Sequence, residues 1–246
     1  MLIALFADIH ANREALEACL ADAASEGADL SVFLGDIVGY GPDPVWVVET
    51  VADLVAKGAL AIQGNHDLAV LDDSVPLNPI ARAAARWTAG KLGDAHRHFL
   101  ADLPLDLNED DRLYVHASAC SPQDWIYTLG PREAFQGFRA TAQRVTFCGH
   151  THIPALFNES PTSLPQQHVP VAGRPMPLLA QRRWIAVLGA VGQPRDHNAA
   201  ACYGLFDTDS NRLSYIRVPY DADLTARKII AQNLPHALAV RLTTGS

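Results

Sequence analysis

The stretch QGNHD, residues 63–67, places an amide, an imidazole and a carboxylate side by side directly after the apolar run 59–62. A short apolar run that ends at a glycine is typical of a buried strand followed by a loop. In isolation, GNHD is equally typical of a helix N-terminus, because Asn and Asp cap helices. The choice between these interpretations depends on whether other segments present similar side chains at similar positions.

Four further segments place His, Asp or Asn where an apolar strand gives way to a glycine-rich or polar loop. They are ADIHAN (7–12), LGDIVGYG (34–41), YVHAS (114–118) and FCGHTHIP (147–154). The first half of the chain alternates apolar runs with amphipathic segments, which is the βαβ pattern of a mostly parallel sheet. The carboxyl ends of parallel strands lie along one edge, where open α/β folds bind ligands. We therefore expect the polar side chains of these segments to converge.

These segments supply a set of possible metal ligands that contains no sulfur: Asp8, His10, Asp36, Asn65, His116, His150 and His152. Residues two apart on an extended chain point the same way, which predicts Asp8 with His10 and His150 with His152 as two pairs. Imidazole and carboxylate ligands suit Mn²⁺, Fe²⁺, Zn²⁺ or Ni²⁺ rather than a sulfur-rich structural zinc site. Seven ligands are too many for one tetrahedral ion and predict two ions that share a carboxylate.

Composition narrows the classes of partner. The chain has 246 residues and a net charge of -8, and its Lys and Arg residues are not clustered. This argues against an extended nucleic acid as a partner, because tracking a phosphate backbone requires a basic surface. Two divalent ions would outweigh the charges of Asp8 and Asp36 and would attract a phosphate group locally. We expect a single domain over residues 1–246, and its oligomeric state stays open.

Hydropathy and cysteine spacing bear on location. No apolar run approaches the ~20 residues that a membrane span requires. The initial LIALFADIH contains Asp and His and is typical of a strand rather than a signal peptide. The four cysteines show no CxxC spacing and are typical of reduced structural thiols. We expect a cytoplasmic protein without a membrane partner.

Periodicity and turn residues predict the order of the elements. Helices are expected at 13–26, 45–57, 80–92 and 94–101, after Pro131, and in two closing segments from 221 that Pro235 separates. Strands are expected at 2–7, 30–34, 59–63, 103–107, 112–117, on both sides of the GHTH loop, and at 183–188, 201–208 and 212–220. The segment 158–182 is rich in Pro, Ser and Gln, which predicts an exposed excursion with room for a short hairpin.

The chain resembles the calcineurin-like metallophosphoesterases, in particular their small bacterial and archaeal branch. The motifs that carry this resemblance are, in order, DIH, GDIVGYGP, GNHD, a histidine after an apolar strand, and GHTH. The same branch is also resembled in HFLADLP, VGQPRD, LFDT and VPYD, so the resemblance covers nearly the whole chain. It implies a four-layer α/β/β/α sandwich of two mixed sheets with the metals at one edge. It also implies two ligand sets that share Asp36: Asp8, His10, Asp36 and His152 for one metal, and Asp36, Asn65, His116 and His150 for the other.

The resemblance implies hydrolysis of a small phosphorylated or nucleotide-like substrate by a hydroxide that bridges the metals. Phosphodiesters are favoured over monoesters, and Mn²⁺ is the metal of choice in vitro. His66 would protonate the leaving oxygen or stabilise the phosphate, and Asp67 would orient the His66 imidazole or raise its pKa. GDIVGYG in place of GDxVDRG argues against a protein serine/threonine phosphatase. The alternatives are cleavage of the pyrophosphate link of dinucleotide polyphosphates, a non-catalytic metal-binding scaffold, and a regulatory nucleotide-binding module.

Three further residues have two interpretations each. Asn12 either caps the first helix or lines the site, and Tyr40 either contacts substrate or stabilises its glycine turn. Arg195 either clamps a phosphate through its planar guanidinium or pairs with Asp196. The remaining histidines have no evident partners and are expected at the surface: His96, His98, His168, His197 and His236. Ala117 and the stretch VLGA at 187–190 depart from the family pattern without removing a ligand, so substrate preference cannot be inherited from relatives.

Overall fold

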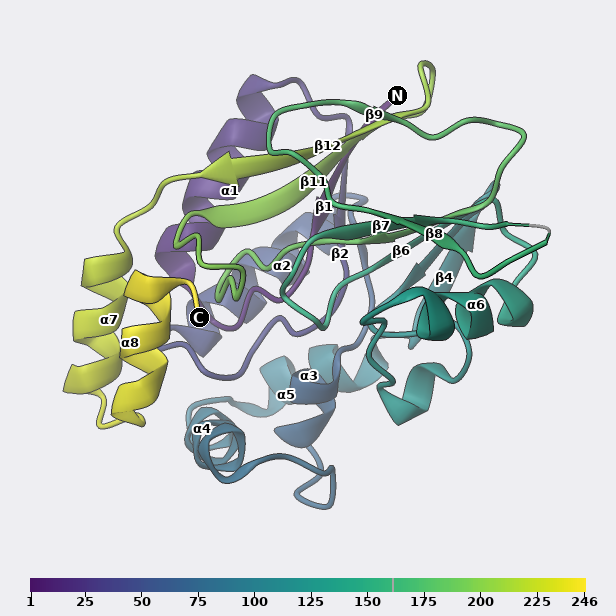
Figure 1. The fold of residues 1–246 in the computed structure, drawn as a ribbon. Coiled ribbons are helices and arrows are strands. Elements are labelled where there is room, and N and C mark those ends of the chain that lie inside the picture. Colours follow the sequence, from purple (N-terminus) through teal and green to yellow (C-terminus); the bar gives the residue numbers. More distant parts are fainter. Residues whose placement is uncertain (161) are drawn as a thin grey trace.

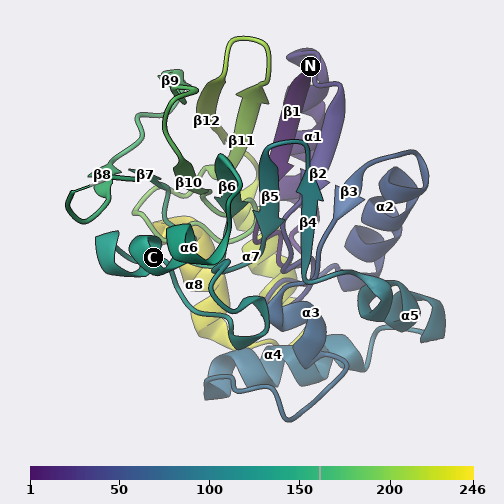
Figure 2. The ribbon, with the colours of Figure 1, turned by 90° about the vertical axis from the view of Figure 1, so that its right-hand side faces the viewer.

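The computed structural model describes residues 1–160 and 162–246, and in them two six-stranded mixed sheets pack face to face (Figures 1 and 2). The first sheet has the order β3-β2-β1-β11-β12-β9 and the second β4-β5-β6-β10-β7-β8. The first contains β1 (Leu2–Phe6), β2 (Leu30–Phe33), β3 (Leu60–Ala61), β9 (Met176–Pro177), β11 (Ala201–Asp207) and β12 (Arg212–Val218). The second contains β4 (Asp106–Glu109), β5 (Arg112–Val115), β6 (Val145–Cys148), β7 (Ala155–Asn158), β8 (Gln166–His168) and β10 (Trp184–Val187).

The described part of the chain contains eight α-helices. They are α1 (Arg13–Ser25), α2 (Pro44–Ala56), α3 (Asn65–Ala69), α4 (Pro79–Ala89), α5 (Asp94–Asp102), α6 (Pro131–Ala140), α7 (Ala222–Ala231) and α8 (His236–Thr244). A short 3-10 turn spans Pro122–Asp124. The layer with α1 and α2 packs on the first sheet and α6 on the second, on opposite sides of the molecule (Figure 1). The four-layer α/β/β/α sandwich is thereby confirmed.

The apolar runs are continuous because both faces of the central strands are buried. In β1, Ile3 and Leu5 pack between the two sheets, whereas Ala4 and Phe6 pack under the outer helices. In β10, Trp184 and Ala186 face the same intersheet core, whereas Ile185 and Val187 pack under α6. Strands of this kind have no polar face and therefore lack the alternating pattern of half-exposed strands.

The parallel strands bring the chemistry-bearing loops to one edge. β1, β2 and β3 run parallel in the first sheet, and β5, β6 and β10 run parallel in the second. All five of the segments identified in the sequence follow one of these strands. The expected convergence at the carboxyl ends of parallel strands is confirmed, but two sheets rather than one supply the loops.

Most of the described residues in the excursion 158–182 are exposed, as predicted. The excursion contributes β8, which pairs antiparallel with the preceding strand β7, and β9, which pairs with β12. Each short strand thus extends the free edge of a different sheet, where backbone groups would otherwise lack partners.

Other expectations for single residues are mostly met. Three cysteines are buried, Cys120 is exposed, and all four are reduced. His98, His197 and His236 are exposed, whereas His96 and His168 are only partly exposed. The partial burial of His168 has a cause, because its Nε2 bonds to Asn158 Oδ1 at 2.7 Å. Within the described part of the chain, no helix is both long and apolar enough to cross a bilayer.

Candidate metal centre

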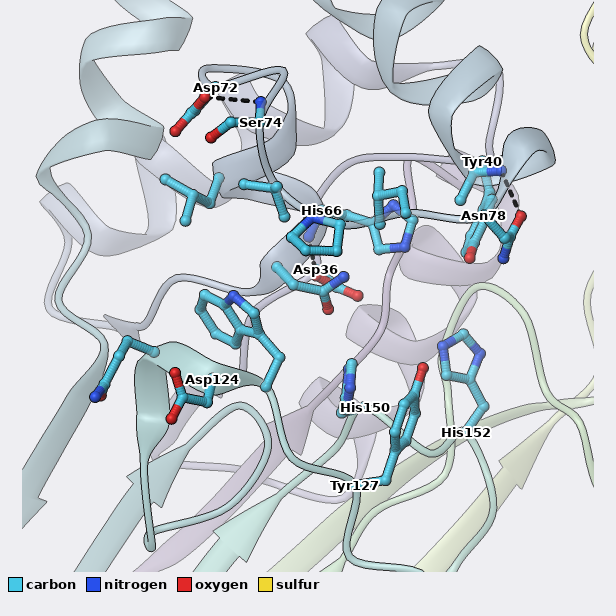
Figure 3. A pocket seen from close by; sticks show the side chains of 18 of the residues that line it. Asp36, Tyr40, His66, Asp72, Ser74, Asn78, Asp124, Tyr127, His150 and His152 are labelled. Carbon is cyan, nitrogen blue, oxygen red and sulfur yellow. Dashed lines mark hydrogen bonds between the residues drawn. The ribbon is translucent and has the colours of Figure 1, made fainter.

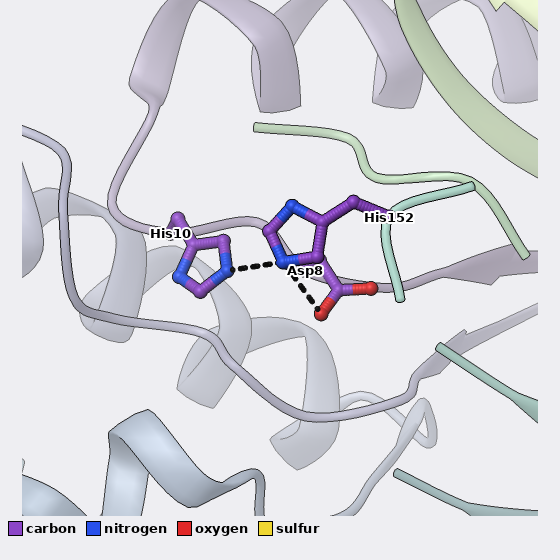
Figure 4. A group of neighbouring side chains, drawn as sticks. All are labelled: Asp8, His10 and His152. Carbon is purple, nitrogen blue, oxygen red and sulfur yellow. Dashed lines mark hydrogen bonds and ion pairs between the residues drawn. The ribbon is translucent and has the colours of Figure 1, made fainter. Parts of the chain in front are cut away.

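The first cluster of possible ligands consists of Asp8, His10 and His152, which are all buried (Figure 4). The Nε2 atoms of His10 and His152 lie 3.1 Å apart. The Nε2 atom of His152 also lies 3.5 Å from Asp8 Oδ1. Asp8 and His10 come from the loop after β1, and His152 comes from the loop after β6 on the other sheet. The cluster therefore forms only when the two sheets pack together.

The second cluster consists of Asp36, His116 and His150, again all buried. The Nε2 atom of His116 lies 3.2 Å from His150 Nδ1 and 3.3 Å from Asn65 Oδ1. The amide oxygen of Asn65 thus joins the cluster as a fourth, neutral donor atom.

Asp36 connects the two clusters. Its Oδ2 atom lies 3.6 Å from His10 Nε2 and 3.4 Å from His116 Nε2, so one oxygen faces both clusters. The other oxygen, Oδ1, accepts a hydrogen bond of 2.8 Å from the backbone N–H of His66. The structure therefore places this carboxylate where a bridge between two ions would be needed.

Backbone carbonyls fix the orientation of three of the imidazoles. The Nδ1 atoms of His10, His116 and His152 lie 3.1, 2.7 and 2.6 Å from the carbonyl oxygens of Val38, Leu34 and Gln193. Nδ1 donates in each contact, so Nε2 of the neutral ring directs a lone pair into the centre. Buried lone pairs and carboxylate oxygens that face one another without a cation fit a metal pair.

The close packing of buried imidazoles and carboxylates shifts their pKa values. Burial alone would lower the pKa of His116, but the carboxylate of Asp36 raises it to about 9. Burial raises the pKa of Asp8 to about 7. Burial also holds the pKa of His10 and of His152 well below the usual value. The imidazoles of His10 and His152 are consequently neutral at pH 7, as metal ligation requires.

Many of these residues have an unusual backbone conformation. The φ angles of Asp8, His10, Asp36, His150 and His152 are 55°, 50°, 52°, 67° and 62°. Left-handed conformation in a residue other than glycine costs about 1 kcal/mol or more and is concentrated at functional sites. The extended geometry predicted for HTH is therefore wrong. His150 and His152 turn apart and enter different clusters, whereas Asp8 and His10 share one as expected.

Glycine allows the loops after β2 and β3 to touch. A Cβ atom on Gly64 would lie 2.2 Å from the backbone N of Asp36, which is closer than any real contact. The backbone of GNHD can therefore approach Asp36 closely enough for the hydrogen bond between His66 N–H and Asp36 Oδ1. Gly64 is also the N-cap of α3, so the capping interpretation of GNHD is correct as well and coexists with its place in the centre.

A cavity of about 530 Å³ opens above the two clusters (Figure 3). Its floor includes Asp36, Asn65, His150 and His152, and His66, Tyr40 and Arg195 also line it. The remaining walls come from residues 72–81 and 123–127. The cavity is of the size that small-molecule sites usually have.

Comparison with known proteins agrees with this geometry. Residues 1–211 match the model of the calcineurin-like phosphoesterase superfamily domain. The chain belongs to the calcineurin-like phosphoesterase superfamily. An uncharacterised protein of Methanocaldococcus jannaschii is 34% identical over 250 residues, which cover 99% of this chain and 98% of that protein.

Solved structures show the same fold. A metallophosphoesterase from Sphaerobacter thermophilus is 37% identical and superimposes with a TM-score of 0.91, covering 100% of this chain and 99% of its own. A hypothetical protein from Pyrococcus horikoshii is 21% identical with a TM-score of 0.80 and covers 100% and 98%. The resemblance identified from the motifs is confirmed.

His66 belongs to neither cluster. Its buried ring packs against those of His10 and Tyr40, with centroid distances of 5.0 and 4.4 Å. Its Nδ1 atom has no hydrogen-bond partner among the described residues. Burial lowers the pKa of His66, and the charge of Asp36 opposes this shift.

The predicted contact between Asp67 and the His66 imidazole is wrong. The Asp67 carboxylate accepts hydrogen bonds from the backbone N–H groups of Val38 at 3.0 Å and Gly64 at 2.9 Å. Both oxygens are thus used to join the loop after β2 to the loop after β3. Asp67 faces the backbone of these loops because α3 turns it away from its neighbour His66.

The structure also decides between the interpretations of Asn12. It caps α1, because its Oδ1 accepts a hydrogen bond of 3.2 Å from the N–H of Ala15. Its Nδ2 donates to the carbonyl of Gly192 at 2.8 Å. With these atoms engaged, the predicted substrate-binding role of Asn12 is replaced by a structural one.

Arg195 and Tyr40 both line the cavity. Asp196 pairs with Arg217, not with Arg195. Arg195 donates to Gln193 at 2.9 Å, and its guanidinium carbon lies 5.7 Å from the centre of the Tyr40 ring. Tyr40 is 6% exposed, has a φ of 59° and lies between two histidine rings, so it supports the turn and lines the cavity at once.

Two aromatic residues of the cavity were not identified from the sequence. Trp125 and Tyr127 lie in the segment between β5 and α6 and approach the rings of His116 and His150. The letters QDWIY resemble an ordinary loop. Their spacing does not show that the connection folds back on its own His116 or that Tyr127 reaches His150 after β6.

Proposed function

We propose that the chain is a dinuclear metal-dependent phosphoester hydrolase that acts on small phosphorylated or nucleotide-like substrates and prefers phosphodiesters to monoesters. The observation that carries this proposal is the pair of buried clusters that share Asp36 at the floor of the cavity. Membership of the phosphoesterase superfamily supports the reaction class.

Each ion would have four donors in this structure. Asp8, His10, Asp36 and His152 would hold one, and Asp36, Asn65, His116 and His150 would hold the other. The set of nitrogen and oxygen donors suits Mn²⁺, Fe²⁺, Zn²⁺ or Ni²⁺, and Mn²⁺ is the choice for assays. Such ions supply Lewis acidity to phosphoryl oxygens and lower the pKa of bound water.

The residues around the centre would bind and protonate the substrate. Arg195 lines the cavity beside His152 and presents its guanidinium, a planar donor for phosphate oxygens. His66 lies over Asp36 without being committed to either cluster, and its imidazole can deliver a proton to a leaving alkoxide.

The size of the cavity supports a preference for diesters over monoesters. A phosphate group alone would fill a small part of a cavity of about 530 Å³. The cavity extends from the clusters to residues 72–81 and 123–127, which leaves room for a second ester substituent. Binding energy from such a substituent can lower the barrier for a diester and is absent for a simple monoester.

The test is the initial rate of hydrolysis of bis(p-nitrophenyl) phosphate and of p-nitrophenyl phosphate by metal-free protein reloaded with Mn²⁺. We expect turnover that requires both Mn²⁺ and Asp36, with Asp36→Asn as the control, and a higher rate on the diester. A higher rate on the monoester would overturn the preference. No turnover on either, with two ions bound, would favour pyrophosphate-linked substrates first and a non-catalytic scaffold second.

A further inference from the structure

Two aromatic rings form one wall of the cavity directly beside the second cluster. The ring of Tyr127 stacks on that of His150 with a centroid distance of 4.0 Å and an interplanar angle of 22° (Figure 3). The ring of Trp125 meets that of His116 edge-on, with centroids 5.8 Å apart. Tyr127 is 45% exposed and Trp125 is partly exposed. These rings therefore present apolar surface to whatever enters the cavity.

The backbone at Trp125 is held in a conformation that bulky residues avoid. Its φ and ψ are 52° and 41°, in the left-handed region, directly after the 3-10 turn Pro122–Asp124. A tryptophan in this region is an outlier, because glycine or asparagine would adopt it at lower cost. Strain of this kind at the wall of a binding cavity is consistent with a functional demand on the side chain. The ring is not part of a buried core cluster that would explain it.

Apolar side chains and two carboxylates also line the cavity. The apolar side chains are those of Leu68, Val75 and Leu77. The carboxylate of Asp72 and that of Asp124, which directly precedes Trp125, form an acidic rim. Arg195 is the one Arg or Lys among the described residues that line the cavity. A second phosphate bound away from the metal clusters would therefore meet carboxylates, whereas a planar organic group would meet apolar and aromatic surface.

We propose that Trp125 and Tyr127 form an aromatic subsite that holds the planar organic group of a phosphate ester, such as an aryl ring or a nucleobase. Trp125 is then a specificity-determining residue: it selects esters of one phosphate with a planar substituent over aliphatic esters. The subsite deepens the proposed function and rests on it for the position of the phosphate at the metal clusters.

The experiment measures binding rather than turnover, so the two proposals can fail separately. Calorimetry with Mn²⁺-loaded protein gives the Kd values of phenylphosphonate and methylphosphonate, which carry the same charged group and differ in the substituent. We expect phenylphosphonate to bind about tenfold more tightly, as stacking on an aromatic side chain provides. Trp125→Leu should reduce the ratio to about twofold or less, and Trp125→Phe should retain most of it.

Trp46→Leu is the matched control. Trp46 lies on α2 beneath Arg13, outside the cavity, and its loss should leave the ratio unchanged. If Trp125→Leu does not fold, Tyr127→Leu replaces it, because Tyr127 is nearly half exposed and its substitution should not disturb folding. Tyr127→Leu should reduce the ratio of the two Kd values by half or more. Equal affinities in the unmodified protein, or an unchanged ratio in the folded variants, would overturn the subsite. A selective subsite in a protein without phosphoesterase turnover would overturn the proposed function alone.

Discussion

The Nε2 atoms of His10 and His152 lie 3.1 Å apart while the Nδ1 atom of each ring is bonded to a backbone carbonyl. With both Nδ1 atoms donating, two lone pairs face each other in a buried space beside the Asp8 carboxylate. A shared cation removes this repulsion. This arrangement of donors fits a bound cation.

Metal removal should lower the melting temperature. An ion present at about 100 times its Kd stabilises the folded state by ~2.7 kcal/mol, and a chain of this size gains roughly 2–4 °C per kcal/mol. Two such ions contribute ~5.4 kcal/mol, so we expect dialysis against a chelator to lower Tm by about 10–20 °C and Mn²⁺ to restore it, as measured by calorimetry. Asp36→Asn should respond weakly to Mn²⁺ because it disturbs both clusters. An equal response from this variant would argue against a shared carboxylate.

Metal binding should release protons. His116, with a pKa of about 9 in the metal-free protein, carries a proton at pH 7.5 that must leave before Nε2 can ligate. Asp8, with a pKa of about 7, adds a further fraction of a proton below neutrality. Calorimetric titration of Mn²⁺ in two buffers of different ionisation enthalpy should give about two released protons at pH 7.5, one from His116 and one from the water that becomes the bridging hydroxide, falling towards one above pH 9. Constant release across this range would contradict the assignment of His116.

His66→Ala should keep both metals and lose activity. His66 lies in neither cluster, and general-acid catalysis is commonly worth about 10²–10⁴-fold. The loss should be larger for a phenyl ester than for a p-nitrophenyl ester, because a poor leaving group depends more on the proton. Metal content is measured alongside, and His98→Ala on the exposed face of α5 is the matched control. Equal losses on both esters would remove the general-acid role.

Arg195→Ala should weaken substrate binding without loss of metal. A charged hydrogen bond to phosphate is worth ~1.5–3 kcal/mol, so kcat/KM should fall by about 10–100-fold. Arg195→Lys should recover only part of this, since an ammonium group lacks the planar pair of donors. Arg13→Ala, on the surface of α1, is the control. Full activity in Arg195→Ala would show that the metals alone bind the phosphate.

The sequence predicts the frame of the centre because position in a parallel sheet follows from strand order. The apolar runs before Asp8, Asp36 and His116 are parallel strands, and their ends meet as the pattern requires. The local conformations do not follow from letters alone. His150 and His152 adopt left-handed φ angles that histidine rarely favours, so the two rings separate where an extended chain would keep them together.

Partners distant in the sequence account for the other differences. Asp67 bonds to Val38, 29 positions away, and Asn12 bonds to Gly192, 180 positions away. Neither partner can be inferred from neighbours in the chain. Tyr127 gave no indication of its role because its histidine neighbour, His150, comes from a separate loop.

The acidic rim should favour esters of a single phosphate over pyrophosphate-linked substrates. Asp72 and Asp124 line the cavity away from the metal clusters, and the backbone N–H of Ser74 holds the pKa of Asp72 below its usual value. Asp72 is therefore ionised at neutral pH and repels a second phosphate. Removal of both charges should favour substrates with more than one phosphate.

The double variant Asp72→Asn/Asp124→Asn should raise kcat/KM for a dinucleoside polyphosphate several-fold relative to bis(p-nitrophenyl) phosphate. The gain should be largest at low ionic strength, since salt screens exposed carboxylates. Asp53→Asn on the outer surface of α2 is the control for net charge, and it should leave the ratio unchanged. A ratio that stays constant in the double variant would show that the rim does not exclude a second phosphate, and pyrophosphate-linked substrates would regain equal standing.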